Sequence, residues 1–235
     1  HRYDYIETGS LLSIKKNTQG IVIPSEETRI EMYPMDYEEF RWALGDEVTV
    51  PLMKDTFEKH QGVGDATCRK LMRDFRLYML VGGMPQAVNT YLDTHNLSDV
   101  DAKKREIIEL YADDYRKRDP TGRATRMFMA APSPLTGNAS RYRVTSVLGR
   151  SQDEEDMDEL IQDMEDSMAV NFSYHANDPS VGLSQHKNNE QYKMYVGDTG
   201  LFITMAFWDN AITENIIYHK LLSDKPATDL GYVYE

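Results

Sequence analysis

The first forty residues alternate between polar and apolar positions in a way that predicts short strands. Residues 3–7 alternate and then meet Thr8-Gly9-Ser10, a turn with two hydroxyls and a glycine-permissive bend. A second strand, residues 30–33, ends at Pro34. Ligands of open α/β sheets bind at the carboxyl ends of strands, so the turn at residues 8–10 is the first candidate site. A chain that opens on such a strand is interpreted as a piece of a longer protein.

From residue 36 onward the apolar residues recur at helical spacing. Asp36 and Glu39 have the spacing of a capping box at the start of a short helix. A clearer amphipathic helix is predicted to be capped by Asp65 and to end at Gly82-Gly83, after which Pro85 starts the next helix. The glycine pair is interpreted as architectural, because it lets two helices pack closely.

A long amphipathic helix is predicted over residues 100–118, capped by Ser98 or Asp99. Its predicted buried edge consists of Ile107, Ile108, Tyr111 and Tyr115. Six basic residues on this helix are interpreted as a solvated face in preference to a phosphate site: Lys103, Lys104, Arg105, Arg116, Lys117 and Arg118. The last three also complement the helix dipole. Residues 119–122, Asp-Pro-Thr-Gly, end the helix and mark the best domain boundary.

The second half of the chain predicts helices followed by a hairpin, which is the order of a winged helix. The helices cover residues 125–131 and 153–168, and the strands cover residues 169–174 and 192–196. The helix at 153–168 carries many carboxylates and no basic residue, so the phosphates of a DNA groove would repel it. A role in packing or protein contact is preferred over DNA reading. A calcium site is disfavoured, because the carboxylates lack the glycine turn of a binding loop.

Composition narrows the class of protein. The 235 residues are 40% hydrophobic, which is enough for a core, and the formal net charge is −13. Weak or no nucleic-acid binding is therefore expected, with an unknown protein partner or self-association instead. Cys68 is the only cysteine, which excludes an intrachain disulfide, and no apolar run is long enough to span a membrane. We expect a cytoplasmic protein with no membrane partner.

Three ordered blocks resemble an archaeal and bacterial group of AAA+ superfamily ATPases that carries a winged-helix region and a C-terminal nuclease-like domain. The blocks are residues 7–12 with 32–40, residues 78–88 (Tyr-Met-Leu-Val-Gly-Gly-Met-Pro-Gln-Ala-Val), and residues 195–201 (Tyr-Val-Gly-Asp-Thr-Gly-Leu). The resemblance implies a mixed α/β, helix-rich fold. Its parts would be the C-terminal remnant of an AAA+ nucleotide domain (1–40), a helical lid (41–120), a winged-helix-like region (121–210), and a helix entering a truncated C-terminal domain (211–235).

The resemblance also implies accessory catalytic residues. Thr8 or Ser10 would help to orient the water that attacks the terminal phosphate, and Arg29 would be an arginine finger. The alternatives stay open: Thr8 and Ser10 could simply close a turn, and Arg29 could balance neighbouring glutamates. The parent protein would use ATP and magnesium. This chain has neither a phosphate loop nor magnesium-binding acids, so no cofactor is expected for it alone.

We therefore expect an inactive fragment of an ATPase that couples ATP hydrolysis to remodelling of a protein or nucleic-acid partner. The alternative is a non-catalytic winged-helix protein that binds protein or DNA. Asp198-Thr199-Gly200 also resembles the aspartic-protease triplet, but the second triplet of such enzymes is absent. Asp198 is predicted instead to cap a helix over residues 199–207. A last amphipathic helix is predicted over residues 213–222.

Overall fold

The computed structural model describes residues 30–132, 147–149, 154–176 and 187–209, with the single residues 6, 28, 218, 222 and 223. Within them lie eight helices and one two-stranded antiparallel sheet. The chain divides into two compact units. The first, called the hairpin unit, comprises His1–Tyr33 and Arg141–Tyr195, and the second, called the helical unit, comprises Pro34–Ser140 and Val196–Glu235. The predicted helix-rich character is confirmed.

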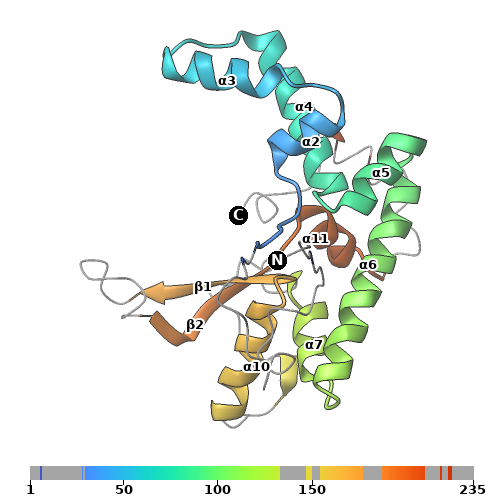
Figure 1. The fold of residues 1–235 in the computed structure, drawn as a ribbon, viewed down its shortest axis with the longest axis vertical. Helices are drawn as coiled ribbons and strands as arrows, with labels where there is room; N and C mark the ends of the chain where they lie inside the picture. The colour runs from blue at the N-terminus through green and yellow to red at the C-terminus, as the bar shows by residue number, and fades with distance from the viewer. Residues whose placement is uncertain are drawn as a thin grey trace, which may run out of the picture. The chain divides into compact units, whose positions relative to one another are not determined.

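Helices make up the described part of the helical unit (Figure 1). They are α2 (Tyr37–Ala43), α3 (Thr49–Glu58), α4 (Asp65–Val81), α5 (Pro85–Thr94), α6 (Leu97–Arg118), α7 (Arg123–Met129) and α11 (Thr199–Ala206). Its apolar core is formed by Phe40, Val81, Ala87, Val88 and Val100, all with no exposed surface. The core therefore joins α2 to the ends of α4, α5 and α6.

Local polar contacts explain where the first helices begin. The predicted capping box of α2 is confirmed, because the Glu39 backbone N–H donates to Asp36 over 2.8 Å and the Asp36 N–H donates to Glu39 over 2.9 Å. Two other predicted caps are wrong. Asp65 is the first residue of α4 rather than its cap, which is Gly64. For α6 the cap is Asn96, whose side chain accepts from the Ser98 N–H, so this helix begins earlier than predicted.

Aromatic contacts pack α7 against the second half of α6. The Phe128 ring lies 5.3 Å from that of Tyr115 and 6.1 Å from that of Tyr111. The turn between the helices is held by Asp119, whose carboxylate accepts from the Ala124 N–H over 2.9 Å and from the Thr121 hydroxyl. This turn, at the expected domain boundary, lies inside the helical unit. The division into four regions stays a prediction.

The hairpin unit contains the predicted acidic helix and both predicted strands. They are α10 (Glu154–Asp166), β1 (Val170–Ala176) and β2 (Lys187–Val196), and the last residue of β2 already belongs to the helical unit. The apolar side of α10 is buried at Leu160, Ile161 and Met164. Exposure alternates along β1, as expected for a strand with one covered face. The helix and strand predictions are thus confirmed in this region.

Candidate functional site

The residues predicted for nucleotide chemistry, Thr8, Ser10 and Arg29, lie outside the described residues, as does the opening strand apart from Ile6. Their roles stay predictions. The second predicted strand, residues 30–33, is described and is wrong, because these residues form neither strand nor helix. Most of the predicted helix at 213–222 also lies outside, apart from Tyr218 and Leu222. What the described residues do show is a group of buried polar side chains in the helical unit, which we call the buried cluster: Asp101, Lys104, Asp198, Thr204 and Tyr218.

Lys104 is the cation of the buried cluster and has no exposed surface. Its ammonium donates to the backbone carbonyls of Leu80 over 2.7 Å and Gly200 over 3.2 Å, and lies 3.4 Å from the Tyr218 hydroxyl. Burial lowers the pKa of Lys104 from 10.5 to about 8, although Asp101 and Asp198 act in the opposite direction. One side chain of α6 therefore holds the end of α4 and the start of α11.

Asp101 is a buried carboxylate that accepts hydrogen bonds on both of its oxygens. One oxygen accepts from the Thr204 hydroxyl over 2.8 Å and from the Tyr218 hydroxyl over 2.6 Å, and the other accepts from Arg105 over 2.9 Å. Burial alone would raise the pKa of Asp101, but these hydrogen bonds and nearby Lys104 lower it overall. The carboxylate thus stays charged although it is buried.

Asp198 is the second buried carboxylate, and the prediction that it caps a helix is confirmed. One oxygen accepts from the Leu201 N–H over 2.8 Å and caps α11, and the other accepts from the Gly83 N–H over 2.6 Å. Burial raises the pKa of Asp198. Because Asp198 is only 5% exposed and both oxygens are engaged, it is placed for structure rather than for activating a water in proteolysis.

The glycines around Asp198 are required by close backbone approach. A Cβ at Gly83 would lie 2.0 Å from the Met35 carbonyl oxygen, and one at Gly200 would lie 2.5 Å from the Val81 carbonyl oxygen. Gly82 has φ +83°, and a Cβ there would meet the Asp198 carboxylate. The architectural interpretation of the glycine pair is confirmed. The close partners are Met35 and Asp198, however, rather than a second helix.

The structure corrects the prediction for two of the basic residues that were assigned to a solvated face of α6. Lys104 is fully buried, and Arg105 is partly buried, with its guanidinium 4.9 Å from the Trp208 ring and donating to the Trp208 carbonyl. The sequence held a signal that was missed: Lys104 lies at helical spacing between Val100 and Ile108, inside the apolar stripe. The cost of removing the Lys104 ammonium from water is offset by backbone carbonyls and carboxylates. These groups are brought near Lys104 only by the tertiary structure.

The arrangement suits a structural role. Every charged group in the buried cluster is hydrogen-bonded, and the contacts join α4, α6, α11 and the segment that contains Tyr218. Within the described ranges no group of His, Cys, Asp or Glu side chains is arranged to hold a metal ion. Over the same ranges, no helix has the length and apolarity needed to cross a bilayer. The buried cluster therefore fastens distant segments together.

A Tyr218→Phe variant should lose about 1.5–3 kcal/mol of unfolding free energy, because it deletes a hydrogen bond to a buried carboxylate. The folded-state pKa of Asp101 lies below its unfolded value of 3.8, so this stability is present above 3.8 and is lost as pH falls through the folded-state pKa. The gap between wild type and variant should thus shrink on acidification. Urea unfolding between about pH 7 and about pH 2.5 measures it. Tyr33→Phe, at an exposed site, is the control, and a gap independent of pH would contradict the assignment to Asp101.

A match to a known protein family includes most of the residues of the buried cluster. A family model described as "Domain of unknown function (DUF8612)" matches residues 72–211, more than half of the chain. The match runs from within α4 to just beyond α11 and includes all of the buried cluster except Tyr218. No curated protein and no solved structure gives a significant match. The match identifies no AAA+ or winged-helix family, so both of those resemblances stay predictions.

Proposed function

Since the chain belongs to the family described as Domain of unknown function (DUF8612), we propose its function from its own residues: it is part of an AAA+ ATPase and transmits nucleotide-dependent movement to a partner. Its helical unit would act as the lid that follows the nucleotide domain. The parent protein would use ATP and magnesium to remodel a protein or nucleic-acid partner. The chain alone, which has no phosphate loop, would be inactive.

The observation that carries this proposal is that the three blocks of the resemblance meet at one point. Met35, from the first block, donates its N–H to the Gly83 carbonyl over 2.8 Å, and Gly83, from the second, donates its N–H to Asp198 of the third over 2.6 Å. These residues are far apart in sequence, and the glycines leave no space for a side chain. The three blocks thus form one structural junction, which supports their interpretation as parts of a single family pattern.

The contacts also suggest how movement would be transmitted. Arg29 precedes Met35 by six residues, and a fully extended chain of that length spans at most about 20 Å. The Met35 N–H is hydrogen-bonded to the Gly83 carbonyl, so a displacement of the segment that leads into Met35 would pull on the junction of α4 and α5. The buried cluster would then carry that displacement to α6 and α11 as one body.

We expect this chain alone to show no micromolar affinity for ATP with magnesium in calorimetry, because only accessory groups remain in it. The ATPase proposal itself has to be tested on a longer protein that includes the upstream region. If the reading frame upstream encodes a phosphate loop, that protein should hydrolyse ATP, and Arg29→Ala should lower its turnover by about 10³-fold or more, as loss of an arginine finger does. Lys15→Ala is the control for loss of charge. An upstream region without a phosphate loop, or an Arg29→Ala enzyme with unchanged turnover, would overturn the proposal.

The second candidate is a non-catalytic interaction or regulatory protein, favoured by the order of α10, β1 and β2 in the hairpin unit. In a DNA-reading winged helix the last helix before the hairpin enters the major groove. Here that helix is α10, whose sequence carries carboxylates and no basic residue. Contact with protein is therefore preferred over contact with DNA for this element.

Duplex DNA should bind this chain only in the weak nonspecific range, with a Kd of roughly 10⁻⁴ M or weaker at physiological salt. The phosphates of DNA would repel the carboxylates of α10, and the few basic residues before the helix do not offset this repulsion. Fluorescence anisotropy with a labelled duplex across a salt series measures this. Submicromolar binding that falls steeply with salt and disappears in an Arg141→Ala/Arg143→Ala variant would contradict the expectation.

A further inference from the structure

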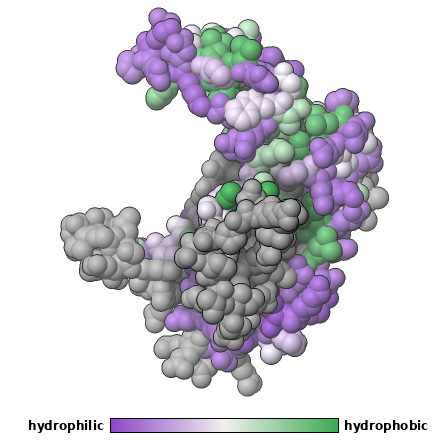
Figure 2. All heavy atoms as spheres, in the orientation of Figure 1, coloured by the Kyte–Doolittle hydropathy of each residue, from purple (hydrophilic) through white to green (hydrophobic). Residues whose placement is uncertain are grey.

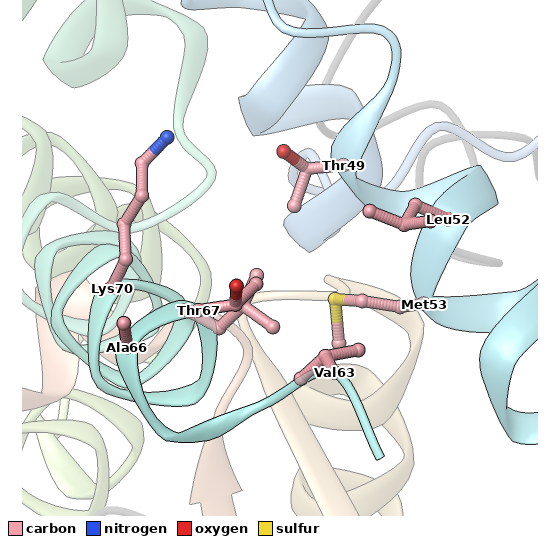
Figure 3. Close-up of a pocket in the computed structure, with 8 residues that line it drawn as sticks. Thr49, Leu52, Met53, Val63, Ala66, Thr67 and Lys70 are labelled. Carbon is pink, nitrogen blue, oxygen red and sulfur yellow. The ribbon is translucent and has the colours of Figure 1, made fainter. Parts of the chain in front are cut away.

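Two helices of the helical unit enclose an open apolar groove (Figure 3). It is lined by Leu52 and Met53 of α3, by Thr67 and Leu71 of α4, and by Val63 between the two helices. The groove has a volume of about 410 Å³. Lys70 of α4 also lines it, and its ammonium extends away from Met53 and Val63 in Figure 3. A site of this kind presents apolar walls and one charged edge to an incoming segment.

The apolar surface continues around the groove. Phe57 is 79% exposed, Val48 is 73% exposed and Leu52 is 47% exposed, whereas α3 buries only Val50. In Figure 2 apolar residues are exposed among hydrophilic ones in this part of the helical unit. Exposed apolar side chains beside an apolar groove are typical of an interaction site. Helix α3 therefore has apolar side chains that the described residues leave uncovered.

The exposed basic residues beside the groove differ in their ion pairing from most other exposed basic residues of the helical unit. Arg69, Lys70 and Arg73 are exposed on α4, and none of them pairs with a carboxylate anywhere in the part of the chain that the structure describes. Most exposed bases elsewhere are paired, as in Lys54 with Glu38, Lys59 with Asp55, Arg116 with Asp113 and Lys117 with Asp114. In a chain with a net charge of −13, three adjacent cations without partners leave a local positive edge.

We propose that the groove between α3 and α4 binds an acidic amphipathic helix of a partner protein. Apolar side chains at helical spacing would enter between Met53 and Leu71, as in other helix-in-groove interactions. Carboxylates on the flank of the same helix would meet Arg69, Lys70 and Arg73, where arginine offers two-pronged pairing. A nucleic acid would use the cations but would leave the apolar walls in water. The inference goes beyond the proposed function and does not depend on nucleotide.

The test uses the whole chain and a fluorescein-labelled peptide of about 16 residues, long enough for four helical turns. The probe carries leucine at i, i+3, i+4 and i+7 with glutamates beside them. One comparison peptide has lysine in place of each glutamate, and another has serine in place of each leucine. Both comparison peptides should bind at least about tenfold more weakly, because each lacks one of the two kinds of contact.

Variants of the chain separate the groove from other surfaces. Met53→Asp and the double variant Lys70→Glu/Arg73→Glu should each weaken peptide binding at least about tenfold. Two matched controls on α6 should leave the affinity within about twofold: Leu110→Asp at a residue 61% exposed, and Arg116→Glu/Lys117→Glu, which makes the same change of charge. Circular dichroism melts of all four variants establish that they are folded.

Several results would overturn the inference. Equal binding of the serine peptide would show a purely electrostatic contact, and equal binding of the lysine peptide would show that charge is irrelevant. A labelled duplex that binds more tightly than the peptide and is lost in Lys70→Glu/Arg73→Glu would assign the cations to nucleic acid. Dimerisation in sedimentation that Met53→Asp abolishes would assign the groove to a second copy. No peptide binding, or no response to either groove variant, would reject the site.

Discussion

A Gly83→Ala variant is expected to lose about 3–5 kcal/mol of unfolding free energy, a large share of the stability of an ordinary domain. The added Cβ would lie 2.0 Å from the Met35 carbonyl oxygen and 2.7 Å from the Met35 nitrogen, both backbone atoms that cannot rotate away. Relief requires separation of Met35 from Gly83, which also breaks the hydrogen bond between them and disturbs the one from Gly83 to Asp198. Urea unfolding followed by circular dichroism measures the loss.

Gly62→Ala is the matched control, because a Cβ at Gly62 would have no atom within 4 Å and the residue has no left-handed backbone. That variant should stay within about 0.5 kcal/mol of wild type or become slightly more stable. Comparable stability of Gly83→Ala and Gly62→Ala would show that Met35 can move aside without cost. The junction would then not be the rigid point on which the proposed transmission of movement depends.

A Lys104→Met variant is expected to lose about 3 kcal/mol or more. Methionine fills a similar volume, so the loss comes from polar groups and not from a cavity. It cannot donate to the carbonyls of Leu80 and Gly200, which would stay buried without that partner. Lys103→Met, at the neighbouring partly exposed position, removes only a surface ion pair with Glu106 and should cost at most about 1 kcal/mol. Equal losses in the two variants would contradict the role of Lys104.

The pH dependence gives an independent test of the same side chain. The folded-state pKa of Lys104, about 8, lies below the unfolded value of 10.5, so between these values the unfolded chain binds more protons. The contribution of Lys104 to stability therefore rises with pH in that window. Wild type should show this rise between about pH 8 and about pH 9.5, and Lys104→Met should lack it. Identical slopes would show that burial of Lys104 does not penalise its charge.

Sequence patterns predicted the helices of this protein better than they predicted its polar interior. The capping box of Asp36 and Glu39 and the stop at Gly82 depend on residues close in sequence, and both are confirmed. The capping of α11 by Asp198 is also local and was predicted. Lys104 was misplaced because its burial depends on Leu80, Gly200 and Asp198, which are distant in sequence. The charge of a lysine assigns it to water unless such partners are known.

The groove between α3 and α4 was not foreseen for a related reason. The segment from Val48 to His60 has no regular apolar spacing, and α3 has its apolar side chains on several faces. A helix that buries only Val50 has no single apolar stripe for a sequence pattern to show. The polar contacts at the start of α3 were not predicted either. Asp46 accepts a hydrogen bond from the Thr49 N–H over 2.9 Å and forms an ion pair with buried Arg41. Arg41 also forms an ion pair with Asp74 of α4.

The order of the two units along the chain has a consequence for biosynthesis. Residues 141–195 of the hairpin unit interrupt the helical unit in the sequence. The hydrogen bond from Gly83 to Asp198 therefore cannot form until 115 further residues have been synthesised. At about 5–20 residues per second a ribosome needs roughly 6–23 s to make that stretch. During this interval α4, α5 and α6 have no α11 to cover them. The nascent chain should therefore recruit holding chaperones, and release from them should coincide with emergence of α11 from the ribosome.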